Sequence, residues 1–106
     1  MFMIDFFNDY KGMAVPKHTQ QTLNDYFLKG WRPGSFIESM LAYDYETALY
    51  KADSANRAAF WAIAMWIREN SPEGSHGNYE MIDAWVKDSH GLRTEFEKKY
   101  MWETLK

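Results

Sequence analysis

The most apolar stretch of the chain is residues 58–67, which hold no charged side chain, glycine or proline and lie between Arg57 and Arg68. These residue types favour a helix, and a helix that is apolar on every side has to be covered all round. The pattern therefore predicts a central buried helix over about residues 54–70. Asp53, just before it, is the residue type that caps a helix N-terminus.

Weaker periodic patterns predict further helices around this one. One helix begins near Pro16 and ends at Gly30. The next helix is expected to begin at Ser35, because Ser35 and Glu38 have the spacing of a capping box. Asp44 is expected to interrupt that helix and cap a short fourth one. Asn78 is expected to cap a segment that closes at His90-Gly91, and residues 92–106 read as a charged helix. No run alternates with period two as a strand does. The fold class is all-α: a compact single domain, residues 1–106, of about five to six helices packed round the central apolar helix.

Aromatic residues mark both ends of the chain. In residues 1–12, Phe2, Phe6 and Tyr10 recur at i, i+4 and i+8, which predicts a short helix with one apolar face. Tyr100 and Trp102 mark an apolar face on the C-terminal helix. The N-terminal helix is expected to dock on the body of the molecule or on a neighbouring subunit. The five aromatic side chains of the two chain ends are candidates for a surface that contacts a partner protein.

Composition excludes several classes of protein. The chain is 46% hydrophobic and 18% aromatic, which indicates a folded protein, and its net charge of −3 argues against direct nucleic-acid binding. It has no cysteine, so disulfides and thiolate sites are absent. The apolar run is too short to cross a membrane, which needs about 20 residues, and the start is a poor signal peptide. These features predict a soluble cytoplasmic protein.

No catalytic or metal-binding motif is visible. His18, His76 and His90 lie far apart, without the close ligand pair typical of zinc sites. Nucleophile elbows and phosphate-binding glycine loops are missing as well. The sequence is therefore expected to encode no enzyme and to need no metal or cofactor.

The most specific polar residues precede the central helix: Lys51, Asp53, Asn56 and Arg57. Together with the loop residues Trp31 and Arg32 they are the candidate binding site, and two interpretations stay open. The cations could gather as a pocket for a phosphate or nucleotide. Alternatively, the cluster is structural, since most polar clusters at helix junctions satisfy backbone groups. Asp53 would then cap the central helix, a buried Asn56 would tie two helices together, and Trp31 would pack into the core.

Several short motifs recur in order between residues 15 and 85: Gly30, Pro33-Gly34-Ser35-Phe36, Ala52-Asp53-Ser54-Ala55-Asn56, Asn70-Ser71-Pro72, Gly74-Ser75 and Trp85. This pattern resembles a family of small helical accessory proteins of tailed bacteriophages, and residues 15–90 form the family-like core. Lys51 stands where the family usually has arginine, and Ser75-His76-Gly77 where Trp-Gly-Ser is common. The family has no assigned activity, so the resemblance implies a setting, the cytoplasm of an infected bacterium, and no catalytic residue.

Three functions are consistent with these observations. The first is binding and inhibition or modulation of a bacterial host or defence protein, an anti-CRISPR-like counter-defence role. The second is a small-molecule binder that sequesters a nucleotide signal through Arg32, Lys51 and Arg57, with Trp31 or Tyr50 stacking on the base. The third is a structural or regulatory homo-oligomer.

Overall fold

The computed structural model describes the backbone of residues 15–105 and the side chains of residues 15–100. The N-terminal helix expected around Phe2, Phe6 and Tyr10, and the side chain of Trp102, lie outside the described residues. Across the described range the chain forms seven helices and no strand: α1 (Lys17–Lys29), α2 (Ser35–Leu41), α3 (Tyr45–Lys51), α4 (Ser54–Ala58), α5 (Phe60–Asn70), α6 (Tyr79–Lys87) and α7 (Leu92–Leu105). The predicted all-α fold class is confirmed, with a slightly higher number of helices.

Three of these helices begin at a residue whose side chain caps the helix N-terminus, as predicted. The Asp44, Asp53 and Asn78 carboxylate or amide oxygens accept hydrogen bonds from the backbone N–H groups of Thr47, Asn56 and Met81. Gly30 ends α1 in the left-handed conformation, with φ of 71°, which glycine adopts without steric cost.

Two predicted boundaries are wrong. Gly34, not Ser35, is the N-cap of α2, and no side chain caps it. The Glu38 side chain cannot complete a capping box because it pairs with Arg32. The helix α6 ends at Lys87, where Asp88 adopts φ of 53°, so it closes before His90 and Gly91.

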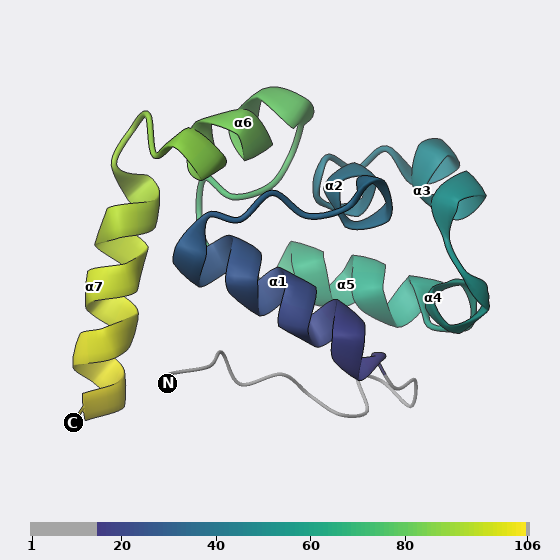
Figure 1. Ribbon diagram of the computed structural model, residues 1–106, viewed down its shortest axis with the longest axis horizontal. Coiled ribbons are helices and arrows are strands. Elements are labelled where there is room, and N and C mark those ends of the chain that lie inside the picture. Colours follow the sequence, from purple (N-terminus) through teal and green to yellow (C-terminus); the bar gives the residue numbers. More distant parts are fainter. Residues whose placement is uncertain (1–14, 106) are drawn as a thin grey trace.

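The predicted central helix is present but divided. Ala59, with φ of −100° and ψ of 12°, separates α4 from α5, and nothing in the local sequence explains the break. In Figure 1, α5 lies behind α1, and α2 packs against α3, α5 and α6.

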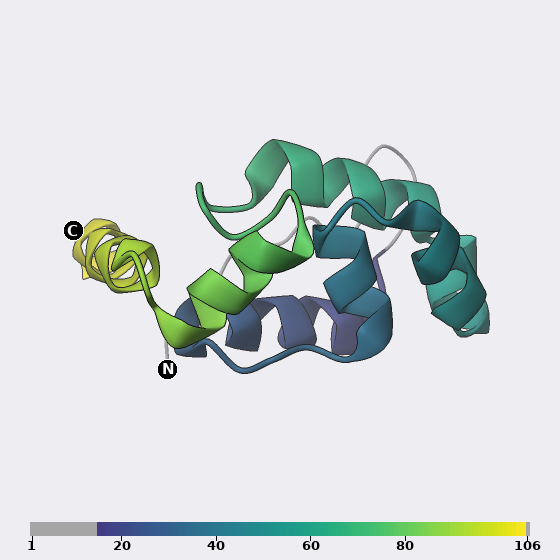
Figure 2. The ribbon, with the colours of Figure 1, turned by 90° about the horizontal axis from the view of Figure 1, so that it is seen from above.

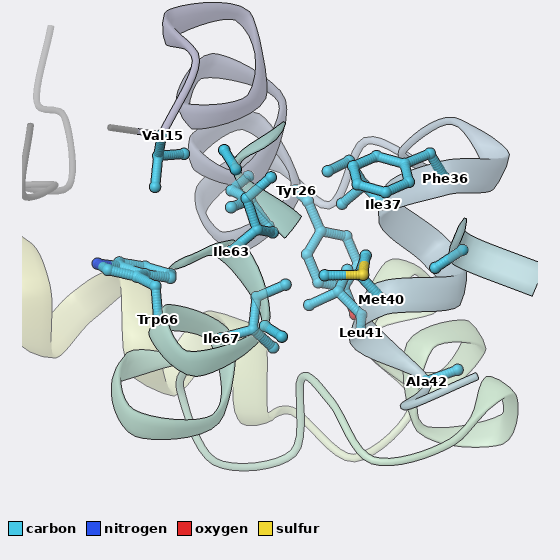
Figure 3. Close-up of a cluster of buried hydrophobic side chains, with 14 of the residues drawn as sticks. Val15, Tyr26, Phe36, Ile37, Met40, Leu41, Ala42, Ile63, Trp66 and Ile67 are labelled. Carbon is cyan, nitrogen blue, oxygen red and sulfur yellow. The ribbon is translucent and has the colours of Figure 1, made fainter. Parts of the chain in front are cut away.

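One face of α5 builds the core. Ile63, Trp66 and Ile67 are buried, and Figure 3 shows the two isoleucines facing Tyr26 of α1 and Leu41 of α2. The helix is not covered all round, however, because Trp61 on the same helix is 63% exposed. The other helices shield only the face of α5 that points toward α1 and α2.

The C-terminal helix α7 forms one edge of the molecule. Figures 1 and 2 show it beside the C-terminal end of α1 and the end of α6, while α3 and α4 occupy the opposite end. The chain measures 35 × 29 × 20 Å along its principal axes. Within the described range, no helix is both long and apolar enough to cross a membrane.

Candidate binding surfaces

The junction before α4 forms a hydrogen-bonded network that includes two of the predicted site residues. Asp53 Oδ1 accepts from the backbone N–H of Asn56 at 2.8 Å. Asn56 is buried, and its Oδ1 accepts from the hydroxyl of the equally buried Thr19 on α1. His18 Nε2 lies 3.7 Å from the second Asp53 carboxylate oxygen. Asn56 therefore ties α4 to α1, as the structural interpretation of this cluster predicts.

The two cations of this junction do not converge on a pocket. The Arg57 guanidinium donates to the Ala52 carbonyl at 3.2 Å, which places it along the turn between α3 and α4. Lys51 is exposed in the last turn of α3.

Arg32 lies elsewhere and is already neutralised. Its two terminal nitrogens each donate at 2.8 Å, one to Glu38 of α2 and one to Asp83 of α6. These contacts raise the pKa of Arg32, with the Asp83 hydrogen bond as the main cause. Because α6 and α4 are separated in both views of the ribbon, the structure does not bring Arg32 to Arg57 (Figures 1 and 2). These contacts favour the structural interpretation of the cluster over a basic pocket that combines these cations.

Trp31 does not plug the core. It is 59% exposed, and the Lys29 ammonium group lies 4.5 Å from the centre of its ring. Trp85, by contrast, is buried in the core and donates its indole N–H to the Tyr26 carbonyl at 3.0 Å.

Large apolar side chains are exposed at the end of the molecule that α3, α4 and the start of α5 form. We call Leu49, Tyr50 and Trp61 the aromatic end; their exposed fractions are 51%, 85% and 63%. Leu49 and Tyr50 lie on α3 and Trp61 in the first turn of α5, and α4 connects these two helices (Figure 1). Beside Tyr50 a shallow hollow of about 410 Å³ is lined also by Asp44, Glu46 and Thr47. Interface hot spots are enriched in tryptophan and tyrosine, so this end is the candidate contact surface.

A second cluster, which the sequence did not reveal, surrounds the turn between α2 and α3. We call Tyr43, Tyr45, Arg68 and His76 the turn cluster. The Tyr43 hydroxyl and His76 Nδ1 are 2.5 Å apart, and the Arg68 guanidinium lies 4.0 Å from the centre of the Tyr43 ring. Arg68 Nε also donates to the Tyr45 hydroxyl at 2.6 Å. The cluster holds the loop after α5 against the α2–α3 turn.

The backbone and the electrostatics of this turn are unusual. Tyr43 has φ of 64°, a left-handed conformation that non-glycine residues seldom adopt and that often marks functional sites. Burial, with a smaller effect of Arg68, lowers the pKa of His76. Burial raises the pKa of Tyr43. The neighbouring Tyr79 hydroxyl donates to Asp44 at 2.7 Å, which lowers the pKa of Asp44 and raises that of Tyr79 to about 12.

The turn cluster could not be predicted from the sequence, because its four residues are 2 to 33 positions apart and follow no common spacing. Among the residues with described side chains, no three His, Asp or Glu side chains gather closely enough to hold a metal ion.

A groove of about 510 Å³ separates α7 from the loop after α5. Its apolar wall is formed by Pro72, Leu92, Phe96 and Tyr100, and its rim by Glu73, Glu95 and Lys99. Of the predicted partner residues only Tyr100 has a described side chain, and it lines this groove. The ring centres of Tyr100 and Phe96 are 5.9 Å apart.

Comparisons with known proteins assign no relative. No protein-family model, no curated protein and no solved structure matches the chain.

Proposed function

We propose that this protein acts by binding another protein, and that the aromatic end is the contact surface. The observation that carries the proposal is that three of the five large apolar residues exposed on the described part of the chain, Leu49, Tyr50 and Trp61, lie on α3 and at the start of α5. A tyrosine or tryptophan contributes about 150–250 Å² of contact area when a partner covers it, at a low cost in side-chain entropy.

The resemblance to small phage proteins directs the choice of partner. On that basis the target is a protein of the bacterial host or of its defence systems, and binding inhibits or modulates it in the host cytoplasm without chemistry. This is a counter-defence role in the manner of anti-CRISPR proteins.

The nucleotide-binding alternative has less support from the geometry. Arg32 would have to leave Glu38 and Asp83 before it could contact a phosphate, and two carboxylates beside it would repel an anion. Thermal-shift assays with a panel of cyclic nucleotides test this alternative, because a ligand at 100 times its dissociation constant stabilises a protein by about 2.7 kcal/mol.

The contact surface is tested with a matched pair of variants. The double variant Tyr50→Ala/Trp61→Ala removes two aromatic side chains of the aromatic end, and Trp31→Ala removes an equally exposed tryptophan from a different loop. Each is used with the wild type as bait in lysate of a bacterial host, and the captured protein is then purified and its affinity measured.

We expect the wild type and Trp31→Ala to bind the same stoichiometric partner with equal affinity. The double variant should bind it at least tenfold more weakly, a difference of about 1.4 kcal/mol. Circular dichroism confirms that each bait is folded. Equal affinity of all three proteins would exclude the aromatic end, and the absence of any partner would argue against the function itself. Light scattering on the wild type tests the homo-oligomer alternative.

A further inference from the structure

The four arginines of the chain differ in what their guanidinium groups bind. Arg32 donates from both terminal nitrogens to carboxylates, and Arg57 and Arg93 each donate from a terminal nitrogen to a backbone carbonyl. Arg68 is exposed and donates from Nε to the Tyr45 hydroxyl. Among the described residues, none accepts a hydrogen bond from its two terminal nitrogens, and none forms an ion pair with it. These N–H groups are therefore available to a ligand.

The guanidinium group of Arg68 is held in place by aromatic rings. It lies 4.0 Å from the centre of the Tyr43 ring and 5.5 Å from the centre of the Tyr45 ring. These two rings are stacked, with centres 6.2 Å apart, and Phe60 packs edge-on against Tyr45 with ring centres 6.1 Å apart. Because the rings fix its orientation in advance, the guanidinium loses less freedom when a ligand binds.

The backbone at Tyr43 is strained, and its side chain supports Arg68. The Asp44 N–H donates to the Ser39 carbonyl at 2.9 Å, which places Tyr43 at the left-handed position of a helix-ending turn where glycine is usual. Tyrosine adopts its φ of 64° only at a steric cost. Its ring lies against Arg68, and its hydroxyl is 2.5 Å from His76 Nδ1. The strained residue therefore positions the arginine whose terminal nitrogens are available.

We propose that Arg68 and Tyr45 form a binding site for a carboxylate. The planar guanidinium group matches the two oxygens of a carboxylate and can bind them through two parallel hydrogen bonds. The Tyr45 oxygen accepts from Arg68 Nε, so its own O–H remains a donor, and no described residue accepts from it. It can donate to the same ligand.

The charge of the turn cluster favours a carboxylate over a phosphate. Burial, with a smaller effect of Arg68, lowers the pKa of His76, so Arg68 is the one permanent cation of the cluster. A single positive charge balances the single negative charge of a carboxylate. A phosphate group carries about two negative charges near neutral pH, and the cluster would leave part of that charge unbalanced.

Two sources can supply the carboxylate. One is a small carboxylic acid in solution, and the other is an acidic side chain or the C-terminus of a bound protein. The site does not include the residues of the aromatic end, and its test needs no partner protein. Failure of this inference therefore leaves the proposed function intact, and the reverse also holds.

Titration with acetate, followed by nuclear magnetic resonance, tests the site in the wild-type protein. The Nε–Hε signals of the arginines are assigned, and sodium acetate replaces sodium chloride at constant ionic strength. The Arg68 signal should shift saturably, with a dissociation constant at least threefold lower than that of Arg57, which is also exposed and serves as the internal control. Acetamide, which is similar in size but uncharged, should shift neither signal.

A matched pair of variants tests the role of the hydroxyl. Tyr45→Phe keeps the ring and removes the O–H donor, so acetate should bind at Arg68 at least twofold more weakly. Tyr50→Phe removes an exposed hydroxyl from the same helix and should leave the affinity unchanged.

Three results would overturn the inference. The first is an equal response of Arg68 and Arg57 to acetate in the wild type. The second is an equal acetate affinity of Tyr45→Phe and Tyr50→Phe. The third is inorganic phosphate binding at Arg68 as tightly as acetate, which would contradict the assignment to a carboxylate.

Two short peptides distinguish the sources. Acetyl-glycyl-glutamyl-glycinamide offers a side-chain carboxylate, and acetyl-triglycine offers a C-terminal one. If either peptide shifts the Arg68 signal with at least threefold higher affinity than acetate, the ligand is the carboxylate of a protein. If both bind no more tightly than acetate, the site is assigned to a small carboxylic acid.

Discussion

Replacing each tryptophan of α5 by alanine tests whether this helix is covered on one face only. Trp66 is 3% exposed and Trp61 is 63% exposed, although the two residues lie only five positions apart. Trp66→Ala should therefore unfold the protein far more easily than Trp61→Ala.

The magnitudes follow from the area that each side chain buries. A fully buried tryptophan removes about 150–250 Å² from water, worth roughly 4–6 kcal/mol at about 25 cal/mol per Å². Residual compactness of the unfolded chain reduces this figure, so Trp66→Ala should cost about 3–5 kcal/mol, the range typical of such truncations. Trp61 buries only about a third of its surface, and the same reasoning gives about 1–2 kcal/mol.

Urea unfolding followed by far-ultraviolet circular dichroism measures both changes. Fluorescence is unsuitable, because each variant loses one of the five fluorophores. The slope m should stay constant, so that the midpoint alone reports stability. In thermal unfolding, Trp66→Ala should lower Tm by more than about 12 °C, and Trp61→Ala should lower it by about a third as much.

Equal losses for the two variants would refute the reasoning. Trp61 would then be covered in solution, and the aromatic end would not be available to a partner. A stability that rises with protein concentration would identify a second copy of the chain as the cover.

Three further predictions concern polar residues. Asp53→Ala should cost about 1 kcal/mol and Asp53→Asn much less, because asparagine also caps; urea unfolding distinguishes them, and equal costs would remove the capping role. Asn56→Ala should cost about 1–3 kcal/mol by leaving the buried Thr19 hydroxyl without its acceptor, and adding Thr19→Val should recover part of that loss; strict additivity of the two losses would contradict the bond. Because burial and Arg68 hold the pKa of His76 below its ordinary 6.5, the unfolded chain binds more protons in that window, so stability should fall as pH drops below about 6.5. The free energy of unfolding of His76→Gln, measured between pH 5 and 8, should not show this fall. If its pH dependence equals that of the wild type, His76 is not the group responsible.

The polar part of the candidate site could be predicted only where its geometry is local. Asp53 and Asn56 are three residues apart, so the cap follows from sequence spacing. That Asn56 would tie two helices was also predicted, although Thr19 as its partner was not. The pairing of Arg32 with Asp83 joins residues 51 positions apart, and no spacing rule reaches across such a separation.

The sequence by itself determined the helical class and most helix ends. Helix ends depend on caps that satisfy backbone groups only a few residues away, so they can be predicted from the local sequence. Asp44 and Asn78 at helix starts and Gly30 at a helix end are examples. Only the tertiary structure decided which apolar residues are covered. Trp61 and Trp66 have the same local chemistry on one helix, and they differ because α1 and α2 pack on one side of α5 and leave the other to solvent.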